Sequence, residues 1–174
     1  MMPAPGDDRP IRPAAAAAVP VTSGGGGPKI NPATGLSTDY LNHFTEAVML
    51  IEMAVGLPNC LHDLDAWQPK TYAEHFAASG FSNRRAIFAA YQAADPSSRT
   101  ALDRTAGLLN ALVMRDRELV RGHIGTPEID AVARRAATRL RALIARAAAV
   151  INGISVETMD RNGPQAAIDA MFRR

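Results

Sequence analysis

Residues 37–55 read STDYLNHFTEAVMLIEMAV and form the longest apolar-periodic run in the first half of the chain. At about 100° per residue, the apolar side chains of this run fall on one broad face, as in a helix that packs against a core. Ser37 or Thr38 can cap the start of the helix, because a hydroxyl oxygen accepts one of the unpaired backbone N–H groups there. Gly56 and Pro58 indicate its end, since Gly adopts the left-handed cap conformation and Pro cannot continue a helix. We therefore expect an amphipathic helix on which the rest of the chain packs.

The rest of the chain also has the composition of a helical protein. Its 174 residues, 47% of them apolar, are enough for about one domain with a buried core. Alanine-rich segments with few β-branched runs favour helices. Capping and breaking signals, such as Thr71 with Glu74 and Asp95 with Pro96, predict further helices over 60–67, 72–79, 83–94, 96–121, 127–152 and 164–174. The predicted fold class is all-α, an irregular bundle of about five to seven helices, two of them long.

The N-terminal residues 1–36 differ from the rest in composition. They are rich in Pro, Ala and Gly and show no apolar periodicity, so we expect them to bury too little to offset the entropy of ordering. The glycine run 24–27 lacks the spacing of a phosphate-binding loop, so a flexible linker is the simpler interpretation. We predict a disordered tail over residues 1–36 and a single helical domain over residues 37–174.

The helix over residues 127–152 has the clearest apolar face in the chain, and we predict Thr126 as its cap and Pro127 in its first turn. Five arginines flank that face, and small residues occupy the opposite side, where a second helix could approach closely. The alternative is that these alanines only raise helix propensity. The predicted partner-binding surface consists of Arg134, Arg135, Thr138, Arg139, Arg141, Ala142, Ala145, Arg146 and Ala149.

The charge of the chain is divided unevenly along its length. Residues 38–95 hold seven acids and three bases, a net charge of −4, whereas residues 96–174 hold thirteen Arg and eight acids, a net charge of +5. The two halves can neutralise each other within one bundle or associate between molecules. Together with the arginine-flanked helix, this division predicts a non-catalytic protein-interaction or regulatory module. Its partner would be another protein or a second copy of this chain.

A metal-binding bundle is the main alternative. Asp39, His43 and Glu46 lie at positions i, i+4 and i+7 of the first helix and could supply ligands to a divalent metal from one strip. Such a site could support an oxidoreductase or a hydrolase. The diiron pattern of helical bundles needs Glu-x-x-His on two helices, however, and here the order is reversed and occurs once. We therefore expect no cofactor, with a divalent metal as the alternative.

A weak nucleic-acid binder is a third possibility, because the arginines of the 127–152 helix could follow phosphates. No aromatic residues are interleaved with them, and no helix-turn-helix pattern is visible. No G-x-S-x-G motif or Ser–His–Asp arrangement can be identified, so an enzyme is the less favoured interpretation.

The cellular environment can be predicted from two simple features. The longest apolar runs fall short of the roughly 18 to 20 residues that span a bilayer, so we expect no membrane partner. Cys60 is the only cysteine, so no intrachain disulfide can form and a reducing compartment is expected. The predicted location is the cytoplasm.

Overall fold

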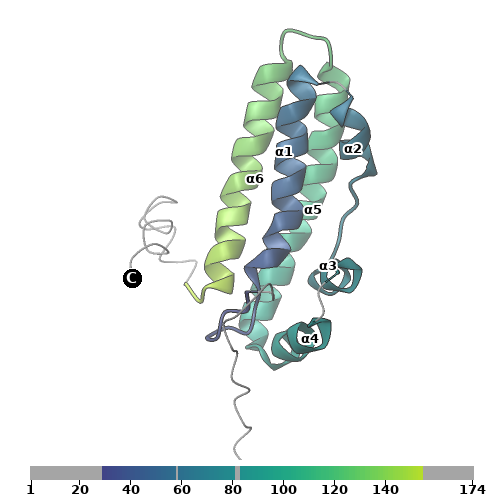
Figure 1. Ribbon diagram of the computed structural model, residues 1–174. Coiled ribbons are helices and arrows are strands. Elements are labelled where there is room, and N and C mark those ends of the chain that lie inside the picture. Colours follow the sequence, from purple (N-terminus) through teal and green to yellow (C-terminus); the bar gives the residue numbers. More distant parts are fainter. Residues whose placement is uncertain (1–28, 58, 81–82, 155–174) are drawn as a thin grey trace, which may run out of the picture.

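The computed structural model describes residues 29–57, 59–80 and 83–154, and this part of the chain consists of helices joined by short loops (Figure 1). The described elements follow in the order η1 (Thr38–Leu41), α1 (Asn42–Gly56), α2 (Cys60–Ala66), α3 (Tyr72–Ala78), α4 (Arg84–Ala93), α5 (Pro96–His123) and α6 (Ile129–Ile151). Apart from one isolated bridge between Ile30 and Ser37, this part of the chain contains no β-structure. The predicted all-α bundle with two long helices is confirmed.

Helices α1, α5 and α6 run side by side and enclose the core, while α2, α3 and α4 lie along the α5 side of the bundle (Figure 1). Phe44 and Ile51 from α1, Leu109 from α5 and Leu140 from α6 are fully buried between these three helices. The apolar periodicity of each long helix therefore becomes a shared core. No helix of the described segments has both the length and the hydropathy needed to cross a membrane.

The helix predicted from residue 37 begins as a 3-10 turn and becomes α-helical at Asn42. Ser37 caps this turn, because its hydroxyl accepts the Asp39 N–H at 3.2 Å. The turn is anchored from outside as well. The Tyr40 hydroxyl donates to the Lys70 carbonyl at 2.6 Å, and the Ser37 N–H donates to the Tyr72 hydroxyl at 2.9 Å. These long-range bonds fix the start of α1 against the segment before α3.

Residues 29–36 are folded, so the boundary predicted at residue 36 is wrong. Leu36 is fully buried in the core, and the Thr34 hydroxyl donates to the Ile151 carbonyl at the end of α6. Gly35 has φ +71°, and a Cβ built there would lie 2.8 Å from the Ala90 carbonyl oxygen. The short apolar and turn-forming content of this segment gave no periodicity by which to recognise it. The rest of the predicted tail lies outside the described residues.

Some of the predicted helix caps are present and others are not. Gly56 is the last residue of α1, but it lacks the positive φ of a left-handed cap, so that part of the prediction is wrong. The capping box of Thr71 and Glu74 is present, and the Asp95 carboxylate accepts the Ser98 N–H at 2.9 Å at the start of α5. Helix α6 begins at Ile129, and the Thr126 hydroxyl instead donates to the His123 carbonyl at 2.9 Å. Thr126 therefore stabilises the turn after α5, and the prediction that it caps α6 is wrong. The helix predicted over residues 164–174 lies outside the described part of the chain.

Candidate interaction surfaces

Two of the five arginines selected on α6 form ion pairs with neighbouring helices. Arg141 pairs with Glu52 of α1 at 2.8 Å, and Arg139 pairs with Asp116 of α5 at 2.7 Å. The two residues lie on opposite flanks of α6, so each reaches the helix on its own side. These two contacts link α6 to each of the other long helices and neutralise two of the five guanidinium groups.

The Arg139–Asp116 pair is the more consequential of the two because Asp116 is completely buried. One carboxylate oxygen receives the Arg139 guanidinium, whereas the other, Oδ2, has no hydrogen-bond partner. A buried carboxylate is costly unless it is paired, so Arg139 acts chiefly as the counter-ion of Asp116. Arg139 therefore has a structural role within the bundle.

The other three arginines of the predicted surface lie at the molecular surface. Arg134, Arg135 and Arg146 are exposed, and within the described segments none of them forms an ion pair. Thr138 and Ala142 are exposed between them. The outer side of α6 therefore carries a small-residue strip over its central part, beside guanidinium groups that form no ion pair within the described segments.

Ala149 does not belong to this exposed surface, and its prediction as a partner-binding residue is wrong. Helix α6 ends in a Schellman cap: the Ile154 N–H donates to the Ala149 carbonyl at 2.8 Å, and the Gly153 N–H donates to the Val150 carbonyl at 3.1 Å. This turn folds Ile154 back onto Ala149 and half-buried Ala145. The outward helical phase of Ala149 is correct, but the chain after the helix covers it.

The three residues predicted as metal ligands do not form one ligand set. The Asp39 carboxylate accepts hydrogen bonds from the Lys29 N–H at 2.9 Å and the Ser37 hydroxyl at 3.3 Å. Glu46 is exposed, and the Nε2 atom of His43 is buried with no hydrogen-bond partner. Among the described residues, no group of three or more His, Cys, Asp or Glu side chains could hold a metal ion. The metal prediction is therefore wrong for these residues.

His43 instead belongs to an aromatic cluster. Its ring stacks on Trp67 with the ring centroids 4.5 Å apart, and the Trp67 indole N–H donates to the His43 carbonyl at 3.0 Å. Burial, followed by the positive charge of Lys70 and the neighbouring His75, lowers the pKa of His43 to about 4. The pKa of His75 is lowered as well, chiefly by burial. Both imidazoles are therefore neutral at pH 7, and His43 helps to fill the core.

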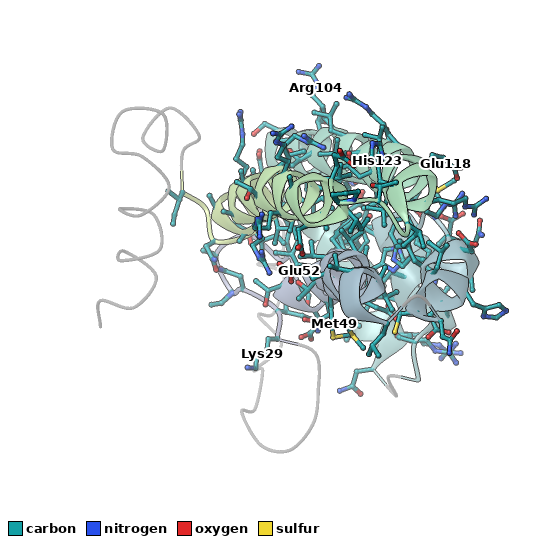
Figure 2. All side chains as sticks on the ribbon, turned by 90° about the horizontal axis from the view of Figure 1, so that it is seen from above. Lys29, Met49, Glu52, Arg104, Glu118 and His123 are labelled. Atoms are coloured by element: carbon teal, nitrogen blue, oxygen red, sulfur yellow. The ribbon has the colours of Figure 1, made fainter. Side chains whose placement is uncertain are left out.

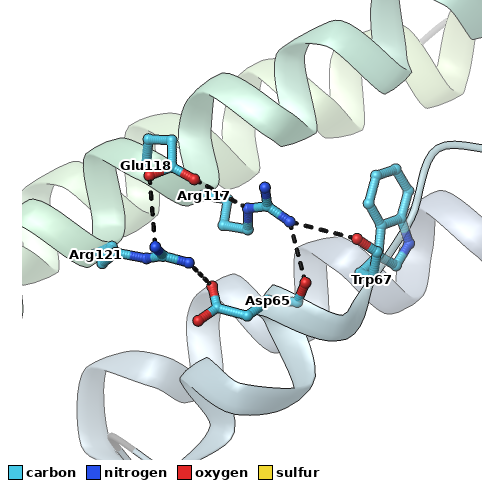
Figure 3. Close-up of polar contacts among 5 residues, drawn as sticks. All are labelled: Asp65, Trp67, Arg117, Glu118 and Arg121. Atoms are coloured by element: carbon cyan, nitrogen blue, oxygen red, sulfur yellow. Dashed lines mark hydrogen bonds and ion pairs between the residues drawn. The ribbon is translucent and has the colours of Figure 1, made fainter.

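An arginine cluster that the sequence did not reveal fixes Trp67 in this position (Figure 3). Arg117 of α5 donates to the carbonyls of Asp65 and Trp67, at 3.2 and 3.5 Å. Arg121 forms an ion pair with the Asp65 carboxylate, and both arginines contact Glu118. Helix α2 is thereby held against α5, and the residue after it, Trp67, is placed over His43.

An open groove of about 520 Å³ runs between the N-terminal half of α5 and the C-terminal half of α6. Arg104 lies on the α5 side and Arg146 on the α6 side, with Ala101 and Val150 among the apolar residues that line the groove. Leu108 follows Arg104 by one helical turn and is 55% exposed. Among the described residues that line this groove none is a carboxylate, so the charge of its lining is positive. We call Arg104, Leu108, Arg146 and the lining residues the α5–α6 groove.

The outer face of α1, in contrast to the groove, carries exposed apolar side chains and a carboxylate. Met49, Met53 and Leu57 are spaced four residues apart and are all exposed, Met49 by 51%. Glu46 lies one turn before Met49, and α1 contains no Lys or Arg. We call Glu46, Met49, Met53 and Leu57 the α1 face.

Comparison with known proteins gives no relative: no protein-family model, no curated protein and no solved structure matches this chain.

Proposed function

We propose that this chain is a non-catalytic protein-interaction module whose basic surface, on the outer side of α6 and the adjoining edge of α5, binds an acidic partner. One observation carries the proposal. The carboxylates that face α6 from α1 and α5 are already paired with Arg141 and Arg139, while Arg134, Arg135 and Arg146 are left exposed without one in the described segments. An acidic partner would supply the missing counter-charges.

The character of the surface between the arginines supports a protein partner. Leu108 and Ala142 are exposed there, and an apolar contact contributes more to a helix partner than to a phosphate backbone. Small residues such as Ala142 would also let a helix approach α6 closely. A nucleic acid remains the alternative that the same arginines support, and its affinity would fall much more steeply with salt because each phosphate contact releases counterions.

A position-dependent crosslink tests this proposal. A photo-crosslinking amino acid is placed at exposed Ala142 in the full chain, and at exposed Ala89 on α4 as the matched control. In an extract of the source cells, we expect a discrete protein adduct from position 142 that is absent from position 89. Arg134→Glu with Arg135→Glu should reduce it several-fold, because both substitutions reverse charges at the surface. Equal adducts from both positions, or none from position 142, would refute the proposed function.

We also propose that the protein acts in the cytoplasm. The support is Cys60, the only cysteine of the chain, which is half-buried and free.

A further inference from the structure

We infer that a second copy of this chain is a partner for the basic surface: the α1 face of one molecule docks in the α5–α6 groove of the next. This inference rests on the proposed function and names the partner. It is carried by two surfaces of the same molecule that are complementary in charge and that both contain exposed apolar side chains.

The α1 face has the pattern of a helix that inserts into a groove. Met49, Met53 and Leu57 form an exposed apolar row at positions i, i+4 and i+8. A contiguous row of large exposed apolar side chains is uncommon on a protein surface and marks an interaction site. Glu46 precedes the row, and α1 itself contains no basic residue. An unbranched methionine can adapt to an irregular partner surface, which suits a contact that forms and separates.

The α5–α6 groove offers the matching features. Arg104 and Arg146 stand on its two sides, so that a carboxylate such as Glu46 entering the groove would meet a guanidinium on either side. Ala101 and Val150 line it, and Leu108 extends its apolar surface by one turn. At 1.5 Å per residue, the α1 face from Glu46 to Leu57 is about 16 Å long, and the groove residues from Pro96 to Leu108 cover about 18 Å of α5, so the α1 face can lie along the α5 side of the groove.

The two surfaces lie on opposite sides of the molecule. Seen along the bundle, Met49 of α1 points to one side and Arg104 of α5 to the other (Figure 2). They therefore cannot meet within one molecule, and a contact between copies is head to tail. Such a contact leaves a free α1 face and a free groove at the two ends, so association continues into a ring or an open chain.

The contact is weak because it is small. One face of a single 15-residue helix falls short of the roughly 800 Å² per partner that stable interfaces bury. Self-association is therefore expected at protein concentrations on the order of 0.1 to 1 mM, and it should decrease at high salt, where exposed charges are screened over a few Å.

Sedimentation velocity with two single variants tests the inference on the full chain. Met49→Lys places a positive charge on the apolar part of the α1 face without lowering helix propensity. Arg146→Glu replaces one of the two positive charges of the groove with a negative charge. Each variant alone should stay monomeric where the parent chain associates. Mixed in equal amounts, they should form a dimer and nothing larger, because only one intact face and one intact groove remain between them. Arg85→Glu, the same charge change at an exposed position on α4, should associate like the parent chain.

The outcomes separate this inference from the proposed function. A parent chain that stays monomeric at every concentration and salt overturns the inference, and so do variants that associate as the parent does or a mixture that forms no dimer. If the chain is monomeric while position 142 still gives a specific adduct with a different protein, the proposed function stands and the inference falls. Far-UV circular dichroism checks that each variant is folded, and Met53→Lys replaces Met49→Lys if the latter unfolds.

Discussion

Mild acid should destabilise this protein through His43. The folded-state pKa of about 4 lies below the ordinary value of 6.5, so the unfolded chain takes up the proton first as the pH falls. Stability contributed by the neutral imidazole is therefore complete above pH 6.5 and is lost as the pH falls toward 4. With 1.36 kcal/mol per pKa unit, the loss is about 2 kcal/mol at pH 5.

The assay uses a probe that the structure places at the site. Trp67 is the only tryptophan of the chain and stacks on His43, so its fluorescence follows denaturant unfolding where the proton would bind. His43→Phe keeps an aromatic ring against Trp67 but cannot be protonated, and it should remove most of the change in unfolding free energy between pH 7 and pH 5. The part that remains is expected from His75, whose pKa is shifted in the same direction.

His62→Gln provides the control, because the His62 side chain is 91% exposed and should leave the pH dependence unchanged. A His43→Phe variant with the full dependence of the parent chain would refute the account of His43 as a buried neutral imidazole. If this variant does not fold, the NMR titration of the His43 ring in the parent chain decides the matter. A ring that titrates above pH 6 contradicts the reasoning.

Three further substitutions test the packing. Leu36→Ala should cost about 3 kcal/mol in the free energy of unfolding by denaturant, because it empties a fully buried site in the segment joined to the bundle; a cost below about 1 kcal/mol would mean that the segment is not part of the core. Gly35→Ala should lower the melting temperature more than Gly125→Ala. Both glycines have positive φ, but only at Gly35 would the new Cβ meet a backbone oxygen. Equal effects of the two substitutions would contradict this close approach. Arg139→Ala should cost about 2 kcal/mol in the same unfolding measurement by leaving Asp116 buried and unpaired, and adding Asp116→Asn should recover part of it; no recovery would show that Arg139 acts through packing alone.

Local sequence patterns were sufficient for the helices and most of their ends. The capping box of Thr71 and Glu74 and the cap of Asp95 depend on residues within three positions of one another, so they can be recognised without the rest of the fold. The apolar period of the long helices likewise follows from spacing alone. Exposed Arg134, Arg135 and Ala142 were identified in this way, because helical phase alone decides which side of α6 they occupy.

The sequence by itself thus determined an all-α bundle, its two long helices and the basic side of α6, whereas the tertiary structure decided which of those residues are free. The Arg139 guanidinium forms an ion pair with Asp116 and is therefore not free. Ala149 is covered by Ile154, which follows the turn at Gly153. The stacking of His43 on Trp67 depends on Arg117, which is fifty positions away from Trp67. The physical reason is that helical phase fixes the direction of a side chain through local backbone geometry, while its partner is set by the packing of segments distant in sequence. Alanine leaves the largest ambiguity, because its small side chain fits a core, a helix contact or solvent equally well.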